Sequence, residues 1–326
     1  TWQRVGVYAA GLALTDAGLA GKPDLLDHTD MIVAAIGGER DVSTDSAILA
    51  GARTAEKPGA FLNERLMNDL RPTLFLAQLP NLLAGNISIV HWVVGSSRTF
   101  LGEESAGVDA VRVAQARIAT AQSEVTLVGG AAHGARWDLL LDFELGGAPL
   151  KNKFAPVWDR GSEGGIALTS LGAFLVLESP DHAKARGAHP RARISAVCSD
   201  RNRRQTGDIE ATLNRQWEAI APQVDRAHAA VLSGASGLEP ATSAERRALR
   251  EFGLPVRNTG TYIGHGIEAQ FAANIGIGCM VLERGKLFPT TGSGDKGESP
   301  GLLSQLLITS VGLWRGEGLA LLERVD

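Results

Sequence analysis

The sequence predicts a layered α/β fold, and three observations support this prediction. First, the 326-residue chain is 44% hydrophobic and 21% charged, which is typical of a globular protein with a large core. Second, stretches with helical periodicity alternate along the chain with short strand-like stretches. Third, the second half of the chain repeats this alternation. We therefore expect two similar halves, residues 1–170 and 171–326, that form a pseudo-repeat.

The first half is expected to contain two helices and two strands. Residues 5–17 have the spacing of a helix, and residues 31–35, Met-Ile-Val-Ala-Ala, form a continuous apolar run that predicts a buried strand. An amphipathic helix is predicted near residues 107–120. A strand is then expected at residues 125–128, ending before Gly129-Gly130.

The second half shows the same kinds of stretch. Strands are expected at 173–178, 192–198, 229–233 and 319–322, and helices at 244–252 and 266–282. The segment 289–301 is rich in Gly, Ser and Thr and is expected to be a surface loop. Its Gly-Ser-Gly-Asp-Lys-Gly stretch lacks the spacing and the strand-to-helix context of a phosphate loop.

Composition and charge exclude several classes of protein. The longest apolar run, 166–177, is too short and too interrupted to span a bilayer, and the N-terminus lacks a signal pattern, so we expect a cytoplasmic protein without membrane insertion. Cys198 and Cys279 lie in apolar surroundings and are expected to be buried, inert thiols. No disulfide framework, metal site or cofactor is therefore expected. The formal net charge of −4 argues against a general nucleic-acid role.

A series of short motifs occurs in a defined order along the chain. They are Leu79-Pro80-Asn81, Gly95-Ser96-Ser97, Glu104-Ser105-Ala106-Gly107, Leu127-Val128-Gly129-Gly130, Pro156-Val157-Trp158-Asp159-Arg160, Gly264-His265, Leu287-Phe288-Pro289-Thr290 and Ser310-Val311-Gly312-Leu313. In this order they resemble the β-ketoacyl-acyl-carrier-protein synthases of the thiolase-like superfamily. The resemblance implies a five-layer αβαβα fold, and it implies that an N-terminal segment of a typical member is missing here.

The same resemblance places Glu104 where those enzymes carry their nucleophilic cysteine. Condensation needs a thiolate at a helix N-terminus, where the helix dipole and free backbone N–H groups stabilise it. Here Glu103 and Glu104 are adjacent and no cysteine is within reach. A carboxylate cannot carry an acyl thioester. Alternatively, Glu104 is simply an acid at a helix start, stabilised by about 0.3–1 kcal/mol through the dipole.

Three further positions depart from the pattern of the family. Gly234 stands where a histidine is expected to help decarboxylate the malonyl extender, and Gly260 stands where a lysine is expected. The second histidine survives as His265, either as a structural hydrogen-bonding group or as the partner of Glu104 in an acid–imidazolium pair. The gating loop reads Gly312-Leu313-Trp314-Arg315, without its flexible double glycine.

These departures leave two main hypotheses for function. The chain resembles chain-length factors and other degenerate synthases, which implies a non-condensing subunit that forms a heterodimer with an active ketosynthase, or a homodimer. A narrower likeness, to synthase-like proteins of very-long-chain fatty-acid clusters, is suggested by the stretch Arg71–Leu74, by Gly95-Ser96-Ser97-Arg98-Thr99 and by the turn that contains Glu104. The alternative is a malonyl-carrier-protein decarboxylase using Glu104 and His265, although a carboxylate would repel the malonyl carboxylate. A homodimer with a different thioester ligand is a third option.

A basic loop offers a candidate contact for the acidic acyl carrier protein. Arg201, Arg203 and Arg204 cluster just after the strand expected at 192–198. Such a loop could steer an acidic partner to the protein. The alternative is a solvated loop without function, since three charges in a polar segment are common on protein surfaces.

Overall fold

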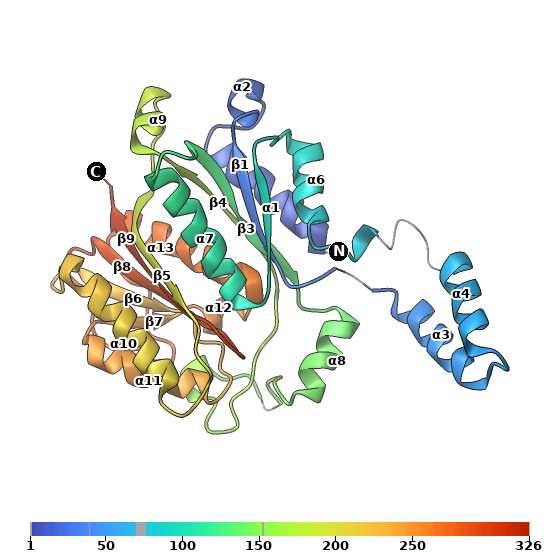
Figure 1. The fold of residues 1–326 in the computed structure, drawn as a ribbon. Helices are drawn as coiled ribbons and strands as arrows, with labels where there is room; N and C mark the ends of the chain where they lie inside the picture. Colours follow the sequence, from blue (N-terminus) through green and yellow to red (C-terminus); the bar gives the residue numbers. More distant parts are fainter. Residues whose placement is uncertain (1, 39, 70–75, 152, 326) are drawn as a thin grey trace.

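Two β-sheets and the helices around them make up the fold (Figure 1). The structure is a computed structural model that describes residues 2–38, 40–69, 76–151 and 153–325. The helices are α1 Trp2–Asp16, α2 Pro23–Leu26, α3 Val42–Thr54, α4 Pro58–Asn68, α6 Leu82–His91, α7 Glu104–Ala119, α8 Trp137–Leu145, α9 Pro180–Ala185, α10 Asp208–Ile220, α11 Ala241–Phe252, α12 Gly260–Ile263 and α13 Gln270–Arg284. The strands are β1 Asp30–Ala35, β2 Ser97–Leu101, β3 Val125–His133, β4 Ser170–Glu178, β5 Ala192–Asp200, β6 Ala229–Ser233, β7 Val256–Asn258, β8 Gln305–Val311 and β9 Glu317–Arg324.

The first sheet has four strands in the order β2-β1-β3-β4. β1 pairs in parallel with both β2 and β3, and β4 runs antiparallel to β3. Every residue of β1 is buried, which explains its continuous apolar sequence, because helices cover both faces of this strand. The predicted boundary at residues 170 and 171 falls at the start of β4, which by its pairing lies in the first sheet.

The second sheet has five strands in the order β5-β9-β8-β6-β7 and repeats this pattern. β6 pairs in parallel with β7 and β8, and β9 runs antiparallel to β8. Strands β7-β6-β8-β9 thus have the same order and directions as β2-β1-β3-β4. The shared topology agrees with the repeat that the sequence predicts.

The helices form three layers around the two sheets. Helices α1 and α6 cover the outer side of the first sheet, while α10 and α11 cover the outer side of the second. Helices α7 and α13 lie between the sheets, where α7 packs on β1, β3 and β5 and α13 packs on β4, β8 and β9. The expected five-layer αβαβα arrangement is confirmed. The N-terminus of α7 is thereby placed in the middle of the molecule.

The strand expected at 125–128 is longer than the sequence indicated. β3 continues to His133, so Gly129 and Gly130 lie inside the strand and not after it. A Cβ atom on Gly129 would lie 2.1 Å from the carbonyl oxygen of Ala173 on β4, and one on Gly130 would lie 2.8 Å from that of Ala34 on β1. These glycines therefore allow neighbouring strands to approach closely and do not end the strand.

A helical arm, α3 and α4, extends from the body (Figure 1). Its two helices pack on each other, and large apolar side chains such as Leu49, Leu62, Leu66 and Met67 are exposed. The Arg71–Leu74 stretch of the sequence analysis lies outside the described residues. Within the described ranges, no helix is long and apolar enough to cross a membrane.

Candidate functional site

Glu104 is the first residue of α7, and its side chain is buried in the centre of the molecule. The helix begins here as the aligned motifs predict, with Glu103 as the residue before it. The positive end of the helix dipole favours a carboxylate at this position. The following residues, Ser105, Ala106 and Gly107, are also buried, so the helix enters the core directly at the site.

The structure brings His265 into contact with Glu104. His265 Nε2 lies 2.7 Å from Glu104 Oε1, and both side chains are almost fully buried. The contact is a hydrogen bond in which the direction of donation depends on the tautomer of the His265 ring. The backbone of His265 is fixed by bonds to the carbonyl of Ala167 and from the amide of Thr169. The two residues therefore form a preorganised acid–histidine pair.

The loop at residues 312–315 closes over this pair. The amide of Leu313 donates to Glu104 Oε2 at 3.4 Å. The carbonyl of Gly312 accepts from Arg204 Nη2 at 2.7 Å, and Arg315 lies 3.6 Å from the carboxylate of Glu103. The ring of Trp314 packs edge-on against a buried phenylalanine, Phe143, of α8. The loop is thus tied at each of its four residues.

Glu268 is a second buried acid of the site, and the sequence analysis did not identify it. It lies in a short 3-10 turn, Ile267–Ala269, three residues after His265, and its Oε1 accepts from the amide of Ile36 at 3.4 Å. Burial raises the pKa of Glu268 to about 8, and the nearby charge of Glu104 adds to the increase. The raised pKa favours the protonated form of this carboxyl at neutral pH. A lone acid within the small, apolar sequence Gly-Ile-Glu-Ala was the signal that could have revealed it.

The two glycines at the expected histidine and lysine positions lie in closed surroundings. A Cβ atom on Gly234 would be 2.5 Å from the carbonyl oxygen of Thr309 and 3.0 Å from Asn274 Nδ2. A Cβ atom on Gly260 would be 2.9 Å from the carbonyl oxygen of Ala235. Contacts this short with backbone require the chain to shift before any side chain can be accommodated.

The three arginines of the predicted carrier-binding loop have different environments. Arg203 is exposed, and Arg201 is exposed while pairing with Asp109 at 3.1 Å. Arg204 instead forms an ion pair with the buried carboxylate of Glu317 and holds the Gly312 carbonyl. The Arg204 guanidinium therefore neutralises a buried carboxylate. Only Arg201 and Arg203 present their side chains to solvent.

Neither cysteine is placed to supply a reactive thiolate. Cys198 of β5 and Cys279 of α13 are both unbonded and partly buried. Burial raises the pKa of both thiols, that of Cys279 to about 11. Among the described residues, no group of three or more His, Cys, Asp or Glu side chains is arranged to hold a metal ion.

Comparisons with known proteins give one family and several structures of the same fold. Residues 1–182 match the family model of the beta-ketoacyl synthase N-terminal domain. No curated protein gives a significant sequence match. A beta-ketoacyl synthase from Burkholderia phymatum STM815 is 20% identical with a TM-score of 0.80, over 100% of this chain and 82% of that one.

Two of the structural neighbours are multi-component systems. The ishigamide ketosynthase/chain length factor is 19% identical with a TM-score of 0.79, over 100% of this chain and 82% of that one. The ketosynthase AntDE, bound to its type II polyketide acyl-carrier protein AntF, is 18% identical with a TM-score of 0.79, over 100% of this chain and 85% of that one. At such identities the likeness establishes the fold alone.

Proposed function

Because this chain belongs to the beta-ketoacyl synthase family, we propose that it is a non-condensing member that acts as a chain-length-factor-like partner of an active synthase. Its pathway would be fatty-acid or polyketide chain elongation. The proposal rests mainly on the residue at the position where the resemblance places the nucleophile. Glu104 occupies it, and its two carboxylate oxygens are engaged by His265 and by the amide of Leu313. A backbone donor that could stabilise an acyl oxyanion is thereby used by the side chain itself.

The closed surroundings of Gly234 and Gly260 support the same proposal. Backbone carbonyl oxygens lie only 2.5 Å and 2.9 Å from where the Cβ atoms of side chains at Gly234 and Gly260 would be. A malonyl group would therefore lack both side chains that the resemblance leads us to expect for its decarboxylation. The tied loop at 312–315 adds a further obstacle, because an acyl chain would have to displace several contacts to enter.

An exposed sheet edge supports pairing with another subunit. β2 forms one edge of the first sheet, so one side of this strand has no partner strand among the residues that the structure describes. The adjoining α6 and the segment after it expose Ile89, Val90, Trp92 and Val94, with Leu101 at the end of β2. An unpaired edge next to exposed apolar side chains is typical of a protein interface. The ishigamide ketosynthase/chain length factor is a neighbour that combines both kinds of subunit.

The acyl carrier protein is the second proposed partner. The AntDE neighbour is a ketosynthase in complex with an acyl-carrier protein. On this chain, Arg201 and Arg203 present exposed guanidinium groups that could receive an acidic carrier. Their proposed role is to orient the carrier toward the paired synthase.

The second candidate function is decarboxylation of malonyl-carrier protein. The observation that favours it is the buried Glu104–His265 contact of 2.7 Å, which could move a proton. Against it stands the charge of Glu104, which would repel the carboxylate of the substrate. The second oxygen of Glu104 also accepts a hydrogen bond from the amide of Leu313, so neither oxygen is free to contact a substrate.

Purification from the native cell tests the two candidates together. The full chain, carrying an affinity tag, is isolated and its bound proteins and acyl chains are identified by mass spectrometry. We expect a stoichiometric synthase that retains its cysteine, and no release of carbon dioxide from malonyl-carrier protein by the isolated chain. A chain that purifies without a synthase and releases carbon dioxide would favour the decarboxylase instead.

A further inference from the structure

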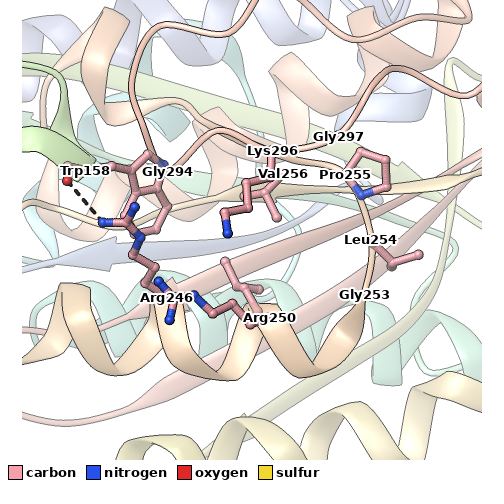
Figure 2. A pocket seen from close by; sticks show the side chains of 11 residues that line it. Trp158, Arg246, Arg250, Gly253, Leu254, Pro255, Val256, Gly294, Lys296 and Gly297 are labelled. Carbon is pink, nitrogen blue, oxygen red and sulfur yellow. Dashed lines mark hydrogen bonds between the residues drawn. The ribbon is translucent and has the colours of Figure 1, made fainter.

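A groove on the outer side of the second sheet is not used by the site described above. It has a volume of about 460 Å³ and lies between the C-terminal half of α11 and the segment 294–297 (Figure 2). This volume is within the range of small-molecule sites. Its lining consists of Trp158, Arg246, Leu249, Arg250, Gly253, Leu254, Pro255, Val256, Gly294, Lys296 and Gly297.

Three cationic side chains border the groove and no acid lines it. In Figure 2, Arg246 and Arg250 rise from successive turns of α11, and Lys296 points toward the helix from the facing segment. Within the described ranges, none of the three forms an ion pair with a carboxylate. Like charges four residues apart on a helix repel each other, so the pair Arg246 and Arg250 lowers the stability of α11. An anion bound between them would remove that cost.

Two acids that adjoin lining residues in the sequence are engaged in other contacts. Asp295, next to Lys296, is buried and accepts from Trp158 Nε1 at 3.1 Å and from the amide of Asn258 at 3.0 Å. Asp159, next to Trp158, accepts from the amide of Ser293 at 3.1 Å. Neither carboxylate lines the groove, so the three cations remain available to a ligand.

The walls of the groove are held in place by the fold. Arg246 lies over the ring of Trp158, with its Cζ 6.0 Å from the centroid, and its Nη1 donates to the Trp158 carbonyl at 3.4 Å. The facing segment pairs with β7 through Val256 and Lys296, and Arg257 donates to its carbonyls. A prearranged site loses less entropy on binding than a mobile one.

The groove also has an apolar part. It consists of Leu249, Leu254, Pro255 and Val256, which line the groove together with the cations and are called its floor below. A ligand that satisfies both parts needs a charged head and an apolar body. Arginine forks suit phosphate oxygens, and three positive charges favour a dianion over a monoanion. We propose that the groove binds a phosphorylated small molecule with an apolar body.

Calorimetric titration of the full chain with phenyl phosphate tests this site. We expect saturable binding with a Kd below about 1 mM. Inorganic phosphate should bind more weakly, because it leaves the floor uncovered, and phenol should not bind detectably. Arg250→Ala and Lys296→Ala should each weaken phenyl phosphate binding, and together by at least about tenfold.

Arg247→Ala is the matched control, because Arg247 also lies on α11 but pairs with Glu210 and does not line the groove. It should change the Kd by less than about twofold. The proposal is overturned if phenyl phosphate does not saturate, if phenol or inorganic phosphate binds equally well, or if Arg247→Ala weakens binding as much as Arg250→Ala. Displacement of phenyl phosphate by unmodified acyl carrier protein would also overturn it, in favour of a protein-docking role.

Discussion

Glu268 gives the folded chain a proton that the unfolded chain does not hold. Its pKa is raised to about 8 in the folded protein, compared with an ordinary value of 4.5. Between these two values the folded state binds more protons than the unfolded state, so the free energy of unfolding falls as pH rises. The contribution of Glu268 is full below about pH 4.5 and is lost by about pH 8.

Glu268→Gln should remove this loss, because the amide resembles the protonated acid and cannot ionise. We expect the variant to be at least about 1 kcal/mol more stable than the parent at pH 8 and nearly equal to it at about pH 4. Urea unfolding at the two values measures the difference. Glu218→Gln, an exposed acid on α10, is the control and should show no such change. Equal stability of Glu268→Gln and parent at pH 8 would contradict the raised pKa.

Arg201 and Arg203, and not Arg204, should determine carrier-protein affinity. Replacing both exposed arginines by Glu is expected to weaken binding at low salt by at least about tenfold, roughly 1.4 kcal/mol, mainly through slower association. The difference should shrink as salt screens the charges. Titration of labelled carrier protein measures it, with Arg193→Glu on β5 as an exposed control. Unchanged affinity at low salt would mean that the loop does not receive the carrier.

The sequence motifs allowed a contact between Glu104 and His265 as one of two interpretations, and these side chains do touch, but neither Glu268 nor the inward role of Arg204 was expected. The first two are placed by short motifs whose order along the chain is readable. The pKa of Glu268 depends on burial by distant segments, including the amide of Ile36. The role of Arg204 depends on Glu317, more than a hundred residues later in the chain. Such contacts leave no local pattern.

At the scale of elements, the strand predictions succeeded where the sequence has a short, continuous apolar run. The predicted bounds of β1 and β6 agree with the structure to within one residue. A short, continuous apolar run is buried on both sides when it forms a strand in a sheet that is covered on both faces. The end of β3 was missed, since two glycines usually indicate a turn and here permit close strand packing. The arm formed by α3 and α4 was also not predicted, because its exposed apolar residues do not follow the pattern of a packed helix.

The edge formed by β2 and α6 should be part of a subunit interface. Ile89→Glu and Leu101→Glu would each place a charge on an exposed apolar side chain of this edge. We expect each to weaken subunit association by at least about tenfold. Sedimentation velocity over a concentration series measures this, with Leu302→Glu as a control at an exposed apolar residue outside this edge. If Leu302→Glu weakens association as strongly, the interface lies elsewhere.

At the scale of the whole molecule, we propose that the fold of the family is retained while its central site is closed. Five layers, two matching sheets and the helix that starts at Glu104 are all present. Glu104, the two glycines Gly234 and Gly260, and the loop at 312–315, which we propose are the altered positions of the site, are held or crowded by several segments of the chain. Restoring one of them therefore leaves the others in place.

The most direct test of this account is Glu104→Cys. The variant is incubated with acyl- and radiolabelled malonyl-carrier protein, beside an active synthase as a positive control, and alkylation of the new thiol confirms that it is present. We predict no elongated product, because Gly234 and Gly260 still leave the malonyl group without its histidine and lysine contacts. Appreciable elongation by Glu104→Cys alone would contradict the claim that the site is closed at several positions.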